Sequence, residues 1–234
     1  MDSLIQFHKV TKEYNTGAKK LLAADNVTFS IDEGEFVVVL GPSGAGKSTI
    51  LNLLGGMDFV SEGDIIINGQ NISRFNEQQL TDYRAKNVGF VFQFYNLIPN
   101  LTAIENVSLM KNVVKTPLDA AEVLISVGLE DHLNKFPSQL SGGEQQRVSI
   151  ARAICKNPAM LLCDEPTGAL DSETGEMILT LLQKLSREQN KTVIIVTHNA
   201  ALAQTADRVI RMKNGKIREV ILNEAPLSVS EVNW

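Results

Sequence analysis

The sequence predicts an α/β fold in which a mostly parallel sheet is covered by helices, with a smaller antiparallel β layer and an inserted helical lobe. Short runs rich in β-branched residues alternate with helical patterns, which is typical of parallel sheets. The strand signal then disappears across residues 101–156, where only helical patterns remain. Buried strands are expected at residues 36–40, 64–68, 87–92, 159–164, 192–197 and 208–212.

The remaining elements follow from local signals. Residues 7–10, 24–31 and 215–222 resemble hairpin or edge strands, so we expect them in the antiparallel layer. The last residues, 223–234, show no periodicity and are expected to form a loosely held tail. Helices are expected at residues 47–54, 102–110, 118–127, 144–156 and 173–189, the last of these amphipathic.

Composition narrows the class of protein. The 234 residues are 44% apolar and 21% charged, which is ordinary for a globular chain that forms one large domain or two unequal lobes. The formal net charge of −5 argues against broad binding to nucleic acid, and no nucleic-acid partner is expected. No signal peptide and no apolar run of membrane-spanning length is visible, so a cytoplasmic chain is expected. Cys155 and Cys163 have no metal-ligand spacing and are expected to be buried and reduced.

A glycine-rich loop between the first predicted buried strand and its helix is the strongest motif. Its glycines allow successive backbone N–H groups to point inward, and the helix N-terminus adds partial positive charge, so the loop is suited to phosphate. Within it, Lys47 is expected to bridge the β- and γ-phosphates of ATP, and the Ser48 hydroxyl to bind Mg²⁺. The predicted ATP-binding loop is Gly41, Pro42, Ser43, Gly44, Ala45, Gly46, Lys47, Ser48 and Thr49.

Two adjacent carboxylates end the predicted strand at residues 159–164. Ligands gather at the carboxyl ends of parallel strands, so both side chains are expected near the phosphate loop. Asp164 is expected to orient Mg²⁺ or its water, and Glu165 to polarise the attacking water as general base.

A second anion-binding feature precedes this strand. In the run 140–148, Ser141 is suited to cap a helix, while Gly142 and Gly143 leave their amides bare at its positive end. This run, Leu-Ser-Gly-Gly-Glu-Gln-Gln-Arg-Val, resembles the signature of ATP-binding cassette (ABC) ATPases. The resemblance covers the chain from about residue 5 to 222 and implies a P-loop NTPase (RecA-like) core.

The resemblance assigns roles to further residues. Tyr14 resembles the aromatic residue that stacks on adenine, and Gln93 the glutamine that links Mg²⁺ to the helical lobe. His198 resembles the histidine that contacts the γ-phosphate and completes, with Lys47 and Glu165, the implied catalytic set. The implied metal ligands are Ser48, Gln93 and Asp164.

The family also implies a partner copy. Two subunits would sandwich two ATP molecules head to tail, so that each site is completed by the other subunit in a homodimer. The γ-phosphate would join two positive helix ends that otherwise separate. The residues that would face the partner's ATP are Ser141, Gly142, Gly143, Glu144 and Asp171, the last in a loop that resembles the one crossing between subunits.

Residues 96–107 and 164–172 resemble one subgroup, which contains MacB exporters, LolD lipoprotein-release ATPases and FtsE. This implies a motor subunit for a separate FtsX- or MacB-like permease that exports peptides, lipids or drugs, held peripherally on the inner face of the membrane. The apolar run 93–103 is then either packing between lobes or a cleft for a short permease helix. Open alternatives are an FtsE-like regulatory ATPase in envelope remodelling and a soluble, non-transport ABC ATPase.

One ABC ATPase domain is expected over residues 1–234. Its catalytic core would comprise residues 1–92 and 158–222. The helical subdomain with the signature would comprise residues 93–157, and the tail residues 223–234.

Overall fold

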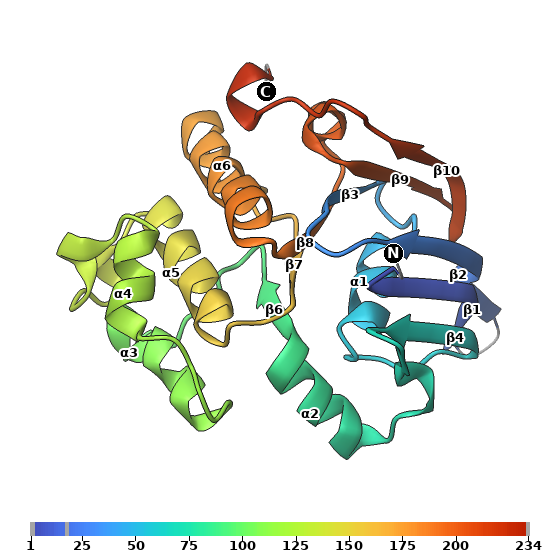
Figure 1. Cartoon of the computed structure of the whole chain (residues 1–234), viewed down its shortest axis with the longest axis horizontal. Helices are drawn as coiled ribbons and strands as arrows, with labels where there is room; N and C mark the ends of the chain where they lie inside the picture. The colour runs from blue at the N-terminus through green and yellow to red at the C-terminus, as the bar shows by residue number, and fades with distance from the viewer. Residues whose placement is uncertain (1–2, 17–18, 233–234) are drawn as a thin grey trace.

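The computed structural model describes residues 3–16 and 19–232, which form two sheets and the helices around them (Figure 1). Strands β6, β7, β8, β3 and β9 are parallel, and β10 pairs antiparallel with β9 at the edge. The order of this sheet is β10 (Lys216–Leu222), β9 (Arg208–Lys213), β3 (Phe36–Leu40), β8 (Thr192–Thr197), β7 (Met160–Asp164) and β6 (Val88–Val91). The predicted α/β fold is confirmed.

The smaller sheet is antiparallel and differs from the prediction in its membership. Its order is β2 (Lys19–Ile31), β1 (Ile5–Thr16), β4 (Glu62–Ile67) and β5 (Gln70–Asn71). The run 64–68, expected in the parallel sheet, lies here, and the run 215–222, expected here, is an edge of the large sheet. Both runs were identified as strands, but their sequence patterns do not specify the strand with which each one pairs.

Helices α3, α4 and α5 follow β6 and precede β7, and they form a group beside the large sheet in Figure 1. This confirms the inserted helical lobe, while its boundaries at residues 93 and 157 stay a prediction. Helix α2 was not expected: only Leu80 and Tyr83 of its eleven residues are buried, so its apolar pattern is weak. The helices are α1 (Lys47–Leu54), α2 (Glu77–Asn87), α3 (Ala103–Ser108), α4 (Ala120–Ser126), α5 (Gly142–Cys155) and α6 (Ser172–Gln189).

The core lies on both faces of the large sheet, as expected where helices and a second layer cover a parallel sheet. On one face the apolar side chains of α3 to α6 pack together. On the other face α1 lies between the two sheets (Figure 1), and its Ile50, Leu51, Leu53 and Leu54 are buried there. Because β3 and β8 are buried along their whole lengths, the loops at their carboxyl ends start from fixed positions.

The C-terminal segment is better held than expected. Val229 is fully buried, and its N–H donates to the Gln183 side chain of α6 at 3.1 Å. The expectation of a loose tail is therefore wrong for this part of the chain. Its sequence does not indicate the contact, because the contact is with a helix residue 46 positions earlier. Residues 233–234 lie outside the described residues. Within the described ranges, no helix is both long and apolar enough to cross a membrane.

Candidate functional site

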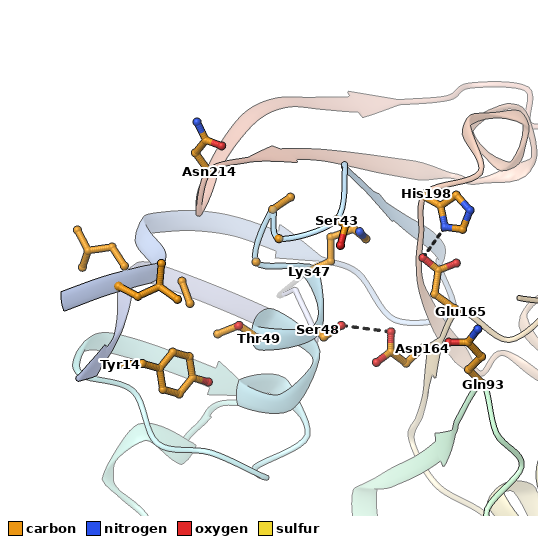
Figure 2. A pocket seen from close by; sticks show the side chains of 16 residues that line it. Tyr14, Ser43, Lys47, Ser48, Thr49, Gln93, Asp164, Glu165, His198 and Asn214 are labelled. Carbon is orange, nitrogen blue, oxygen red and sulfur yellow. Dashed lines mark hydrogen bonds and ion pairs between the residues drawn. The ribbon is translucent and has the colours of Figure 1, made fainter. Parts of the chain in front are cut away.

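The phosphate loop connects β3 to α1 and forms the floor of an open cavity of about 1030 Å³ (Figure 2). Gly44 and Gly46 have φ angles of +75° and +98°, which favour glycine. A Cβ atom on Gly46 would also lie 2.1 Å from the backbone oxygen of Ala23. Glycine therefore avoids backbone strain at position 44, and at position 46 it also avoids a clash with Ala23.

Lys47 extends back over the loop from the first turn of α1. Its Nζ donates to the carbonyl oxygens of Gly41 at 2.8 Å and Pro42 at 3.2 Å. Gly41 and Pro42 thus hold the ammonium group through their carbonyl oxygens but do not line the cavity, whereas residues 43–49 line it. A phosphate in the loop would replace these neutral acceptors with charged ones, which make stronger hydrogen bonds.

Asp164 and Ser48 meet beside the loop, as the sequence predicts. The Ser48 hydroxyl donates to Asp164 Oδ1 at 3.3 Å, and the Gln93 side chain also lines the cavity. Burial raises the pKa of Asp164, the Glu165 charge adds to the effect, and the Ser48 hydrogen bond and Lys47 oppose it. A cation bound here would relieve this penalty. Hard oxygen ligands of this kind suit Mg²⁺, which commonly takes one or two protein carboxylates and completes its shell with phosphates and water.

Glu165 is held at both of its carboxylate oxygens. The Thr197 hydroxyl donates to Oε2 at 2.9 Å, and Nδ1 of His198 lies 2.9 Å from Oε1. Its backbone is left-handed, with φ of +45°. Since such a conformation is unfavourable for a residue with a side chain, the surrounding contacts must enforce it.

Tyr14 lies at the opposite end of the cavity from Glu165 (Figure 2). Its hydroxyl donates to Asp58 at 2.7 Å, and Lys12 bonds the same carboxylate at 2.6 Å. The Lys12 ammonium also lies 4.9 Å from the centre of the Tyr14 ring. Burial raises the pKa of Tyr14, and Asp58 adds to the effect. Asp58 and Lys12 therefore fix the position of the ring.

The predicted second anion-binding end begins α5. The Ser141 hydroxyl accepts from the Glu144 N–H at 3.4 Å, and Glu144 accepts from the Ser141 N–H at 2.7 Å, which is a capping box. Asp171 caps α6 by accepting from the N–H of Thr174 at 3.0 Å. The cavity lining includes none of the five residues predicted for the partner's ATP. Those five residues lie at the starts of α5 and α6, outside the cavity, and Gly143 among them is buried.

The cavity also has lining residues that sequence reasoning missed. Leu21, Leu22 and Ala23 come from β2, and Asn214 comes from the turn between β9 and β10. The Asn-Gly pair at 214–215 is a typical hairpin turn, but the sequence does not indicate that this turn meets the phosphate loop. That contact is made by the Gly215 N–H, which donates to the Ala45 oxygen at 3.0 Å.

The chain matches the family described as "ABC transporter" over residues 24–168. A putative ABC transporter ATP-binding protein of Mycoplasma pneumoniae is 41% identical over 100% of this chain and 51% of its own length. The macrolide export ATP-binding/permease protein MacB of Rhodopirellula baltica is 41% identical over 95% of this chain and 34% of its own length. The chain thus spans about half of the first relative and about a third of the second.

A solved structure has the same fold over nearly the whole chain. It is the dimeric ATP-binding cassette of Methanocaldococcus jannaschii in a post-hydrolysis state bound to ADP and Pi. The two chains are 43% identical and superpose with a TM-score of 0.86, covering 94% of this chain and 99% of the other.

Proposed function

The chain belongs to the ABC transporter family, and we propose that it binds and hydrolyses ATP to power a membrane permease. The observation that carries this proposal is the convergence of Lys47, Asp164 and Glu165 in one cavity that the phosphate-binding loop also lines. Those groups come from two separate parts of the chain, the start of α1 and the end of β7, and supply a phosphate cradle, a cation ligand and a general base.

In this function, ATP lies with its adenine on Tyr14 and its phosphates in the loop of residues 43–49. Backbone N–H groups and the Lys47 ammonium bind the phosphate oxygens. Ser48, Gln93 and Asp164 would hold Mg²⁺, which neutralises charge on the phosphates when bound.

Glu165 accepts a proton from the attacking water. The Thr197 hydroxyl and His198 orient its two oxygens, so the carboxylate is aimed before the substrate arrives. His198 lines the same cavity and its side chain is 74% exposed, so its ring would be open to contact with the γ-phosphate.

The reaction needs a second copy of the chain. Residues 141–144 and 171 lie outside the chain's own cavity, and α5 begins at Gly142, where the first N–H groups of a helix have no partner within the helix. In a head-to-tail homodimer this turn closes over the partner's γ-phosphate. Loss of that phosphate after hydrolysis removes the bridge, and the dimer opens.

The permease contact lies on the connection after β6. Phe94 is 73% exposed and Ile98 is 42% exposed, so two large apolar side chains four positions apart on this connection are open to a partner. A short helix of a MacB- or FtsX-like permease would cover them and transmit the opening of the dimer. Through this contact the permease would hold the chain on the inner face of the membrane, and ATP hydrolysis would drive the export of peptides, lipids or drugs.

Replacement of Glu165 by Gln tests the proposal. Its amide cannot act as a base, so ATP turnover should fall at least about 100-fold, and an ATP-bound dimer should accumulate on size exclusion. Glu188→Gln, at the exposed far end of α6, is the matched control; it should keep wild-type ATP turnover and should not accumulate the ATP-bound dimer. Retained hydrolysis in Glu165→Gln would overturn the assignment of general base.

A further inference from the structure

A buried glutamine joins the two connections that carry the catalytic groups. Gln146, in the second turn of α5, has no exposed surface. Its Nε2 donates to the carbonyl oxygens of Phe92 at 3.3 Å and Pro166 at 2.8 Å. Phe92 immediately precedes Gln93, and Pro166 immediately follows Glu165. We propose that Gln146 is a positioning residue that ties both catalytic connections to the signature helix, an inference that rests on the function proposed above.

The connection after Glu165 needs such a restraint. The left-handed backbone of Glu165 is less favourable than an ordinary conformation for a residue with a side chain. Backbone hydrogen bonds hold it on two sides, from the Glu165 N–H to Val196 at 3.0 Å and from the Gly168 N–H to Glu165 at 3.0 Å. The Gln146 bond to the next carbonyl, that of Pro166, adds a restraint from a different element.

The connection after Phe92 is held by the same helix. Tyr95 and Asn96 both have left-handed backbones, with φ of +50° and +51°. Their carbonyl oxygens accept hydrogen bonds from Arg152 at 3.0 Å and 2.7 Å. Side chains of α5 therefore hold this connection at its start, through Gln146, and in its middle, through Arg152.

Stability alone does not account for an amide at position 146. Its Oε1 has no hydrogen-bond partner within the part of the chain that the structure describes. A buried acceptor without a partner is unfavourable, and this offsets part of what the two donated bonds contribute to stability. The gain is positional: Gln146 lies five residues, about 7.5 Å along the helix axis, from Ser141. Movement of the helix start, where the partner's ATP would bind, is transmitted to both connections.

The chain offers a matched control for this test. Gln183 of α6 is also buried, and its Nε2 also donates to two carbonyl oxygens, those of Thr205 at 3.2 Å and Leu227 at 3.0 Å. Neither of these carbonyls adjoins a residue of the cavity. Gln146→Met removes two hydrogen bonds inside the proposed catalytic machinery. Gln183→Met removes two such bonds outside it, together with the bond that Gln183 Oε1 accepts from the Val229 N–H, so the control disturbs the buried structure at least as much.

Steady-state ATPase assays and ATP-binding titrations should be run on the wild type and on both folded variants. For Gln146→Met we expect kcat to fall on the order of 10- to 100-fold, because small misplacements of reacting groups have effects of this size. Its ATP dissociation constant should stay within about threefold, since the phosphate loop is untouched. Gln183→Met should keep kcat within about twofold, whatever its melting temperature.

If Gln146→Met keeps its kcat, or loses ATP affinity and kcat in equal proportion, the inference is wrong. If Gln146→Met does not fold, Gln146→Glu decides the question. Its protonated carboxyl retains one donor, so its kcat relative to wild type should rise as pH falls from 8 to 6; a flat ratio would overturn the inference. Absence of ATP hydrolysis by the wild type would refute the proposed function instead, so the two failures are distinguishable.

Discussion

Removal of the Tyr14 ring gives a direct measure of how the site holds the base of ATP. The ring is fixed by the 2.7 Å bond to Asp58, and Lys12 lies near its centre, so a base would stack on a ring that is already in place. Stacking of a base on an aromatic side chain contributes about 1–3 kcal/mol by alanine substitution. Tyr14→Ala should therefore weaken ATP binding about 5- to 150-fold, at about 1.4 kcal/mol for each factor of ten.

The assay is isothermal titration with ATP and, separately, with inorganic tripolyphosphate, which has phosphates but no base. Tyr14→Ala should leave tripolyphosphate affinity within about twofold of the wild type, because the phosphate loop does not involve this ring. Tyr14→Phe is the matched control: it keeps the stacking surface and should change ATP affinity less than about threefold. Equal losses for ATP and tripolyphosphate would refute the stacking role and assign Tyr14 to the fold.

Three further predictions concern stability, pH and the permease contact. Arg208 is buried and makes two 2.8 Å bonds to Glu35, so Arg208→Met should lower stability by about 2 kcal/mol and the melting temperature by about 4–8 °C. The exposed control Arg211→Met should change the melting temperature by less than about 2 °C, and equal shifts would contradict the buried ion pair. Burial raises the pKa of Asp164, so the folded protein binds a proton on this carboxyl more tightly than the unfolded chain does. The free energy of unfolding therefore falls as pH rises from the ordinary aspartate pKa through the raised pKa of Asp164. Asp164→Asn should then unfold at a higher temperature than wild type at pH 7 without nucleotide, with a smaller difference at pH 4, while its ATP turnover is lost. A melting temperature of Asp164→Asn below that of the wild type at pH 7 would contradict the predicted direction of this effect. Phe94→Asp should weaken co-purification with the permease and leave ATP affinity unchanged; undiminished co-purification would exclude this residue from the contact.

Much of the site could be predicted from sequence because its signals are local. The phosphate loop depends on glycines and a lysine within nine residues, and Asp164 and Glu165 follow directly from a buried strand. Parallel strands place their carboxyl ends at one edge, so the approach of Asp164 to Ser48 follows from the fold class. Membership of the ABC transporter family, predicted from the run 140–148 among other motifs, is confirmed.

The rest depends on contacts between distant segments. Nothing near Tyr14 in the sequence indicates that Asp58, 44 positions later, would hold its hydroxyl. The partner strand of the run 64–68 is likewise set by packing and not by its own pattern. Gln146 was visible only as part of the signature, because its two hydrogen-bond partners lie 54 and 20 positions away.

The composite nature of the site is tested most directly by the dependence of ATP turnover on protein concentration. If each cavity requires Ser141–Gly143 of a second copy, the rate per molecule of chain should rise with concentration and level off once dimers predominate. Sedimentation of the wild type with ATP and Mg²⁺, during turnover, would locate the dimer transition, which should coincide with the rise in rate. A rate per molecule that is constant across that transition would contradict the composite site.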